Sequence, residues 1–220
     1  IVVEEIGQQA FVMGRADQGP FSLASMIVGI EEFLVAMALP GNEEKLAALL
    51  GFAEEVVYRY AVAQMEQGAH MTSIGESIAG PDVCAPAVYS RWAQTADSRL
   101  VERLREKDIR LAYHICGDAT RIVDEMVDTG ASVLELDYKC DLAAVKAAVA
   151  GKTTVLGVID PSEVIARSSP EVVRQAVRDE LAVLAPGGGL IIGPGCALPP
   201  ETPMENLHAF VEAAHEFGRY

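Results

Sequence analysis

The feature of this sequence that most constrains its fold is a repeated unit, in which a short apolar run is followed by a turn and then a helical stretch. The apolar runs are rich in β-branched and aliphatic residues and lack clean polar alternation, which is typical of parallel strands buried on both faces. They lie at residues 10–16, 70–76, 110–116, 132–137, 153–160 and 189–195. Strands that alternate with helices predict a parallel sheet with helical crossovers, and therefore an α/β fold.

The helical stretches between these runs have recognisable ends. Asn42 precedes a stretch over 43–65 whose apolar residues keep helical spacing. Ser169 is placed as the cap of a second helix that starts at Pro170, and a Pro-Gly pair after residue 185 ends it. No linker, low-complexity tract or charge block interrupts the pattern, so residues 1–220 are expected to form a single domain.

Two α/β architectures fit this alternation, a doubly wound sheet and a TIM barrel. A doubly wound nucleotide-binding fold usually has G-x-G-x-x-G or a P-loop after its first strand, and neither is present. Polar and reactive groups instead follow the C-terminal ends of the apolar runs, where barrel enzymes carry their active sites. Six units average about 37 residues each, and eight would need about 290. We therefore expect an incomplete TIM barrel that contains the last six strand-helix units and lacks the first two.

An incomplete barrel leaves two unpaired parallel edges. The edges at 10–16 and 189–195 are expected to remain open or to be covered by another copy in a homo-oligomer. The chain also begins without methionine, which agrees with an N-terminal truncation.

Charge and composition exclude several classes of function. The net charge of −15 and the pI of about 4.6 argue against binding to nucleic acid or to an anionic membrane. The most apolar stretch, 21–39, is interrupted by Glu31 and Glu32, so no membrane span and no signal peptide are expected. Four cysteines in a chain of this size do not indicate a secreted disulfide framework, and a reducing cytoplasm fits best.

His114 and Cys116 stand two residues apart at the end of the third expected strand. Residues two apart on a strand face the same side, so the imidazole and the thiol should converge at the barrel mouth. A soft thiolate beside an imidazole is a typical zinc-binding pair. For an isolated pair, however, a buried cysteine beside a hydrogen-bonded histidine is the commoner arrangement. Cys196, after the last strand, would supply a third ligand, and a third ligand makes a metal site the favoured interpretation over a structural pair.

The remaining cysteines and histidines are expected to be structural. Cys84 lies in a loop that leads into a helix, and Cys140 lies beyond a strand end. His70 precedes a strand, whereas His208 and His215 lie on the last helix.

Four segments carry a family resemblance. They are GRADQGPFSLA (14–24), MTSIGESIAGPDVCAPAVYSRW (71–92), HICGDATRIVDEMVDTGASVLELD (114–137) and GPGCALPPETPMENLHAFVEAA (193–214). From about residue 10 to its end the chain resembles the uroporphyrinogen decarboxylase superfamily. It is most similar to the zinc-dependent corrinoid methyltransferases of that superfamily, such as methylcobamide:coenzyme M methyltransferase. The decarboxylases carry an arginine-rich segment in their first two strands, which has no counterpart here.

The resemblance implies a TIM barrel and a set of zinc ligands. His114, Cys116 and Cys196 match the family's H-x-C and its distant cysteine. Cobalamin-independent methionine synthases share this layout, and their fourth ligand is an acid at the end of the following strand. The matching acid here is Asp137, with Glu135 on the same strand face as the alternative.

The implied activity is zinc-dependent transfer of a methyl group between a corrinoid (methylcobalamin or a methylcobamide), carried by a partner protein, and a small thiol or similar acceptor. Two thiolates and a carboxylate would keep a zinc-bound thiolate electron-rich, which suits alkylation better than hydrolysis. Asp17, Glu76 and Asp160, at other strand ends, are candidate catalytic residues for orienting the substrate.

Two alternative functions remain open at this point. One is decarboxylation of a tetrapyrrole carboxylate, although a polyanionic substrate calls for basic residues and Arg15 is the only arginine at a strand mouth. The other is a catalytically silent module that binds a metal or docks a corrinoid protein.

Overall fold

The computed structural model describes residues 1–218 and contains one six-stranded parallel sheet. The strands are β1 (Met13–Gln18), β2 (Met71–Gly75), β3 (Leu111–Ile115), β4 (Val133–Leu136), β5 (Thr154–Ile159) and β6 (Leu190–Pro194). Each strand pairs in parallel with the next one in chain order. Strand order in a doubly wound sheet reverses at a switch point, whereas barrel order does not. The α/β barrel-type fold expected from the sequence is therefore confirmed.

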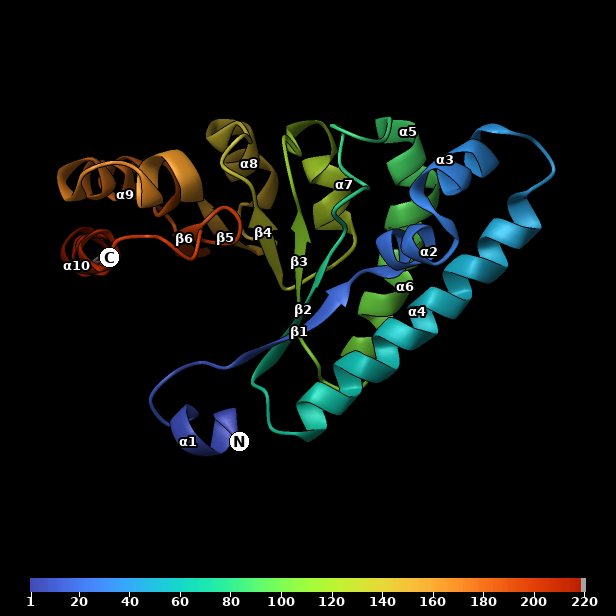
Figure 1. Ribbon diagram of the computed structural model, residues 1–220, viewed down its shortest axis with the longest axis horizontal. Helices are drawn as coiled ribbons and strands as arrows, with labels where there is room; N and C mark the ends of the chain where they lie inside the picture. Colours follow the sequence, from blue (N-terminus) through green and yellow to red (C-terminus); the bar gives the residue numbers. More distant parts are fainter. Residues whose placement is uncertain (219–220) are drawn as a thin grey trace.

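Helices cover one face of this sheet. The longer ones are α2 (Pro20–Val28), α3 (Ile30–Ala38), α4 (Glu43–Glu66), α6 (Gln94–Arg105), α8 (Leu142–Val149), α9 (Pro170–Leu184) and α10 (Met204–Phe217). The shorter ones are α1 (Val2–Ile6), α5 (Pro86–Val88), α7 (Val123–Asp128) and the turns η1 (Tyr89–Ala93), η2 (Thr120–Ile122) and η3 (Pro161–Ala166). Figure 1 shows α4, α6, α7, α8 and α9 following one another along the sheet in chain order, and each contacts the next.

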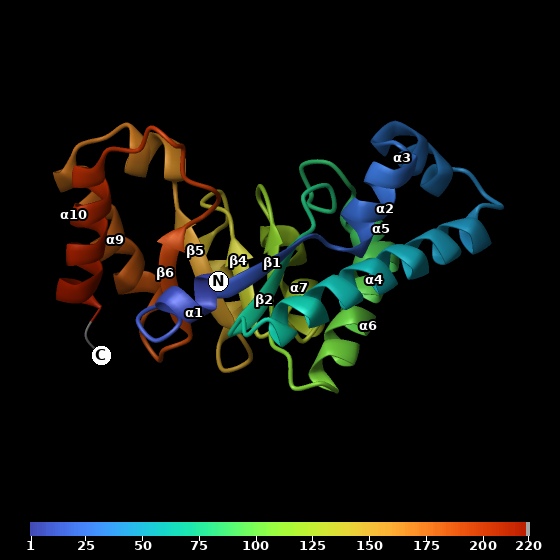
Figure 2. The ribbon, with the colours of Figure 1, turned by 60° about the horizontal axis from the view of Figure 1, so that its bottom comes forward.

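The two faces of the sheet differ in what they contact. Side chains such as Tyr113 and Leu134 point toward the helices and join the main core. On the inner face, away from the helices, Met71, Ala112 and Val133 form a small separate cluster. Within residues 1–218, β1 pairs only with β2 and β6 only with β5, so the sheet is an open arc (Figure 2).

The first strand differs from its expected range, because it begins at Met13 rather than at residue 10. The backbone N–H of Val12 donates to Nδ1 of His70 at 2.9 Å, so strand pairing starts one residue later. The strand also runs on to Gln18 through a register shift, with Asp17 in a left-handed conformation at φ 61°. The other five strands lie within the ranges predicted from the sequence.

The two helices with recognisable ends occur where they are expected. In α4, Leu46, Leu50 and Val57 are buried, but Val56 and Tyr60 are 41% and 53% exposed, so its buried stripe is narrower than the apolar pattern. Ser169 occupies the N-cap position of α9 without a side-chain hydrogen bond to the helix. Pro170, at the first helical position, therefore accounts for the sharp start of this helix.

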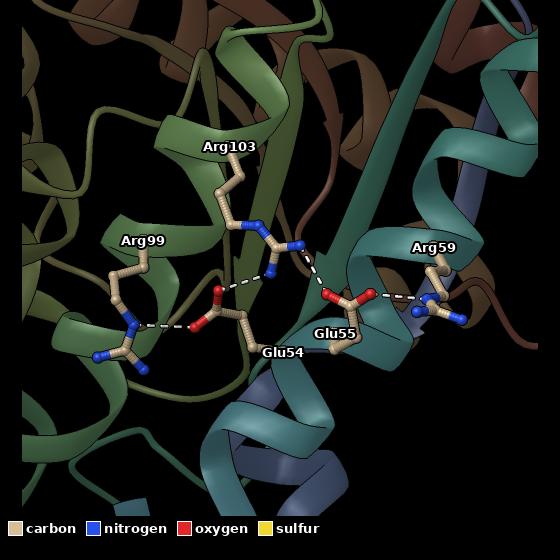
Figure 3. A network of polar contacts seen from close by, with 5 residues as sticks. All are labelled: Glu54, Glu55, Arg59, Arg99 and Arg103. Atoms are coloured by element: carbon tan, nitrogen blue, oxygen red, sulfur yellow. Dashed lines mark hydrogen bonds and ion pairs between the residues drawn. The ribbon is translucent and has the colours of Figure 1, made fainter. Parts of the chain in front are cut away.

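A polar network joins the two helices that flank β1 to β3 (Figure 3). The buried carboxylate of Glu54 on α4 accepts from Nε of Arg99 and Nη1 of Arg103 on α6, both at 2.9 Å. Arg103 also donates to Glu55 at 2.6 Å, and Glu55 accepts from Arg59 one turn along α4. The network fixes α4 against α6 on the outer side of the sheet.

Among the helices of residues 1–218, none has both the length and the apolar composition needed to cross a membrane alone. The adjacent α2 and α3 meet those criteria only when combined, and they are bent by 107° at their junction.

Candidate metal centre

The C-terminal ends of the strands bring an imidazole and two thiols together. His114 is 3% exposed on the inner face of β3, and Cys116 follows two residues later. Nε2 of His114 lies 3.0 Å from Sγ of Cys116. The alternation of side chains along the strand places both groups on the same side of the sheet, as the sequence spacing predicts.

Cys196 reaches this pair from the last strand of the arc, three strands away from β3. A glycine precedes it, and a Cβ at Gly195 would lie 2.6 Å from the backbone nitrogen of Tyr138. The chain after β6 can therefore pass closely over the chain after β4. Sγ of Cys196 lies 4.0 Å from Nε2 of His114, and the ligand atoms of His114, Cys116 and Cys196 all lie within 4.8 Å of one another.

The orientation of the imidazole is fixed from its other edge. Nδ1 of His114 lies 3.0 Å from the backbone carbonyl of Glu135. A carbonyl can only accept, so Nδ1 carries a proton in either charge state of the ring. Nε2 is consequently the nitrogen that faces the two sulfur atoms.

The charges of the three groups depend on one another. The hydrogen bonds from Cys116 and from His114 lower the pKa of Cys196. The same sulfur–sulfur contact, together with burial and the charge of Asp137, raises the pKa of Cys116. Burial acts to lower the pKa of His114, but the contacts with Cys196 and Glu135 outweigh it and raise that pKa. One thiolate is thus already favoured in this cluster, and a bound cation would favour the second.

Two carboxylates border the cluster on different sides. Asp137, 6% exposed, accepts from the backbone N–H of Gly117 at 2.8 Å, and its charge acts on Cys116. Glu135 lies at the Nδ1 edge of His114, with its Oε1 4.0 Å from that nitrogen and its Oε2 3.5 Å from Nη1 of Arg15. Asp137 is therefore on the Cys116 side of the imidazole and Glu135 on the other, and neither belongs to the group of ligand atoms that lie within 4.8 Å of one another.

Of the expected catalytic carboxylates, Glu76 is engaged elsewhere. It is fully buried, and its two oxygens accept from the backbone N–H groups of Phe21 and Ser22 at 2.8 and 2.7 Å. These donors belong to the first turn of α2, where a carboxylate is favoured by the helix dipole. Glu76 thus anchors α2 to the end of β2, and a direct role in orienting a substrate stays a prediction.

Asp17 and Asp160 lie at the ends of β1 and β5. Asp17 is exposed at the irregular end of its strand. Oδ1 of Asp160 accepts from the N–H groups of Ser162 and Glu163 at 2.8 and 3.0 Å, and so caps η3. Neither belongs to the group formed by His114, Cys116 and Cys196, and their catalytic roles also stay predictions.

Cys84 and Cys140 are buried free thiols outside the group formed by His114, Cys116 and Cys196. Sγ of Cys140 accepts from the backbone N–H of Ala119 at 3.4 Å, which is a packing contact. Asp97 on α6, which was not predicted from the sequence, accepts a 2.7 Å hydrogen bond from the buried hydroxyl of Tyr113. Burial and the nearby Glu76 charge hold the pKa of Asp97 well above its usual range. An acidic residue on the apolar face of a helix was the available signal.

The chain is similar to known proteins over almost its whole length. A family model described as uroporphyrinogen decarboxylase (URO-D) matches residues 1–217. A methylcobamide:CoM methyltransferase of Methanosarcina acetivorans is 30% identical over 99% of this chain and 61% of its own length. A uroporphyrinogen decarboxylase of Thermus thermophilus is 32% identical over 90% of this chain and 57% of its own length.

Among solved structures, a methyltransferase from Methanosarcina mazei superposes with a TM-score of 0.87 at 23% identity, covering 99% of this chain and 62% of that one. This likeness shows the fold. The chain spans about three fifths of the length of the relatives it matches.

Proposed function

The chain belongs to the uroporphyrinogen decarboxylase (URO-D) family, and on that basis we propose that it carries the metal centre of a zinc-dependent methyltransferase. The reaction would move a methyl group between a corrinoid bound to a partner protein and a small thiol or similar acceptor. Relatives named as methylcobamide:CoM methyltransferases support both the corrinoid donor and the thiol acceptor. We place this activity in the cytoplasm, where four free cysteines would stay reduced.

The observation that carries the proposal is the convergence of His114, Cys116 and Cys196 at the strand ends. Two sulfurs and an imidazole nitrogen form a donor set that suits zinc, and ligands of one zinc ion lie roughly 3.3–3.8 Å apart. The atoms within 4.8 Å of one another need only small side-chain movements to reach this spacing. When bound, zinc would lower the pKa of the acceptor thiol and so favour the nucleophilic thiolate.

Carboxylates of this chain would complete the metal site and position the reactants. We assign Asp137 as the fourth ligand or as an immediate partner of the metal, because it lies on the Cys116 side of the imidazole. Asp17 and Asp160, at the ends of β1 and β5, would orient the acceptor or the donor from the rim. Glu76 would act by holding α2 in place at the same end of the sheet.

Decarboxylation of a tetrapyrrole is the second candidate, because a named decarboxylase is 32% identical to this chain. The charged groups near the site favour decarboxylation less than methyl transfer. A polyanionic substrate calls for free basic groups at the mouth, whereas Arg15 is paired with Glu135.

The two candidates are separated by incubating the chain with methylcobalamin and a panel of small thiols while zinc content is measured. The methyltransferase proposal predicts loss of methylcobalamin that depends on both thiol and zinc and is abolished in Cys116→Ser. Decarboxylation of a porphyrinogen that is unaffected by Cys116→Ser would favour the second candidate. Zinc binding without either reaction would indicate a module that only binds metal or docks a corrinoid protein.

A further inference from the structure

Arg15 contacts Glu135, the residue that borders His114, and the proposed function gives Arg15 no role. It lies on β1, whereas the carboxylate it contacts lies on β4, so its side chain crosses the inner face over two intervening strands. The side chains of Arg15 and Glu135 are 43% and 17% exposed. A pair that is partly shielded from water interacts more strongly than one on an open surface.

The strand register explains how the guanidinium crosses the sheet. Gly75 on β2, His114 on β3 and Glu135 on β4 are direct neighbours in one row. A Cβ at Gly75 would lie 2.5 Å from Nη2 of Arg15. The guanidinium therefore lies directly over Gly75, and the missing side chain there leaves room for it on the way to Glu135.

Glu135 is also the residue that holds the imidazole. Its backbone carbonyl accepts from Nδ1 of His114 at 3.0 Å, and its carboxylate Oε1 lies 4.0 Å from the same nitrogen. The carbonyl fixes the ring orientation, and the negative charge of the carboxylate near the protonated nitrogen makes the other nitrogen a better donor. Without Arg15, the carboxylate would be free to rotate away from this edge of the ring.

We infer that Arg15 is a positioning residue that acts through Glu135 on His114, and that Gly75 is required because it lets the guanidinium reach Glu135. Arg15 keeps the carboxylate at the Nδ1 edge of the imidazole and away from the two sulfurs. The coordination position of the metal beside Asp137 is thereby left open for another ligand or for the acceptor thiol. This inference rests on the proposed function for its consequence in zinc binding, but the arrangement of the ring does not depend on zinc.

The test uses Arg15→Met and Gly75→Ala, which should displace the same guanidinium by different means. Both should weaken zinc binding about 10-fold or more, measured by competition with a chromophoric chelator. Arg15→Lys should lie nearer to the wild type, since it restores the charge. Arg110→Met is the matched control, because Arg110 lies at the opposite end of β3, beside the cavity lined by Phe11 and Ile191, and it should bind zinc as the wild type does.

A double-mutant cycle tests the route of the effect. If Arg15 acts through Glu135, Arg15→Met should change zinc affinity less than about 2-fold in a Glu135→Gln background, because the two substitutions remove the same arrangement. An equal loss in both backgrounds, or wild-type affinity in Arg15→Met, would overturn the inference.

A second readout is independent of zinc. In the metal-free protein with ¹⁵N-labelled histidine, the Nδ1–H proton of His114 should exchange with solvent faster in Arg15→Met and Gly75→Ala than in the wild type or in Arg110→Met. Unchanged exchange would overturn the inference even if no variant bound zinc. Failure of the wild type to bind zinc would count against the proposed function alone.

Discussion

Nε2 of His114 and Sγ of Cys116, which are two residues apart in the chain, lie 3.0 Å apart at the end of β3. The distance follows from strand alternation, which turns residues two apart to the same side of the sheet. Cys196 joins them from a strand three positions away, because the sheet curves and brings both strand ends toward the same space. The pairing of His114 with Cys116 is therefore set by local strand geometry, whereas the approach of Cys196 is set by the tertiary fold.

The cysteines should fall into two classes. Cys116→Ser should abolish zinc retention and any methyl transfer, since a hydroxyl neither ionises nor binds zinc as a thiolate does. Cys84→Ser and Cys140→Ser should retain near-normal zinc content, because both thiols are buried outside the cluster. Zinc measured per purified chain checks this, and equal loss in all three variants would contradict the assigned ligands.

Asp137→Asn should weaken zinc binding about 10–100-fold, the range seen when a group bordering a metal is changed. The amide oxygen can still accept the N–H of Gly117, so the fold should be retained. Asp141→Asn is the control, because Asp141 only caps α8. Wild-type zinc affinity in Asp137→Asn would exclude a role for this carboxylate at the metal.

The sequence predicts most of the fold for a clear physical reason. Parallel strands buried on both faces need continuous apolar runs, and the five strands after β1 occupy the predicted runs. The start of β1 could not be predicted, because it depends on a hydrogen bond from Val12 to the side chain of His70, 58 residues away.

The candidate site was predictable only in part. The strand-end positions of His114, Cys116 and Cys196 are visible in the sequence, and the resemblance supports all three. The contact of Glu135 with Arg15 was not visible, since it joins residues 120 positions apart across two strands. The role of Glu76 in anchoring α2 likewise depends on a contact between residues 54 or more positions apart.

Stability should depend on pH through Glu180 on α9. Burial raises the pKa of Glu180 to about 8, and within the described residues its Oε2 has no hydrogen-bond partner. A raised pKa in the folded state means that the contribution of this group to stability is full below its ordinary pKa of 4.5 and is lost as pH rises through about 8. Glu180→Gln should therefore stabilise the protein by about 1–3 kcal/mol at pH 9 and hardly at all at pH 4.

Denaturant unfolding of the wild type and Glu180→Gln at several pH values measures this difference. Glu212→Gln, on an exposed part of α10, serves as the control. A difference in unfolding free energy between Glu180→Gln and wild type that does not change with pH would show that the carboxyl is not buried as described.

The two glutamates at the junction of α4 and α6 should contribute unequally to stability. Glu54→Gln removes the charge shared by Arg99 and Arg103 at a buried position and should lower the unfolding free energy by about 1–3 kcal/mol. Glu55→Gln, whose side chain is more exposed, should cost less than Glu54→Gln. Thermal or denaturant unfolding compares them, and equal costs would contradict the role assigned to Glu54.

X-ray absorption at the zinc K-edge of the zinc-loaded chain tests the central claim most directly. A site built by His114, Cys116 and Cys196 predicts two sulfur neighbours at about 2.3 Å and nitrogen or oxygen neighbours at about 2.0–2.1 Å. Cys116→Ser and Cys196→Ser should each lose sulfur neighbours or lose the metal altogether. A zinc ion surrounded only by nitrogen and oxygen, or a wild-type chain that retains no zinc, would contradict the account.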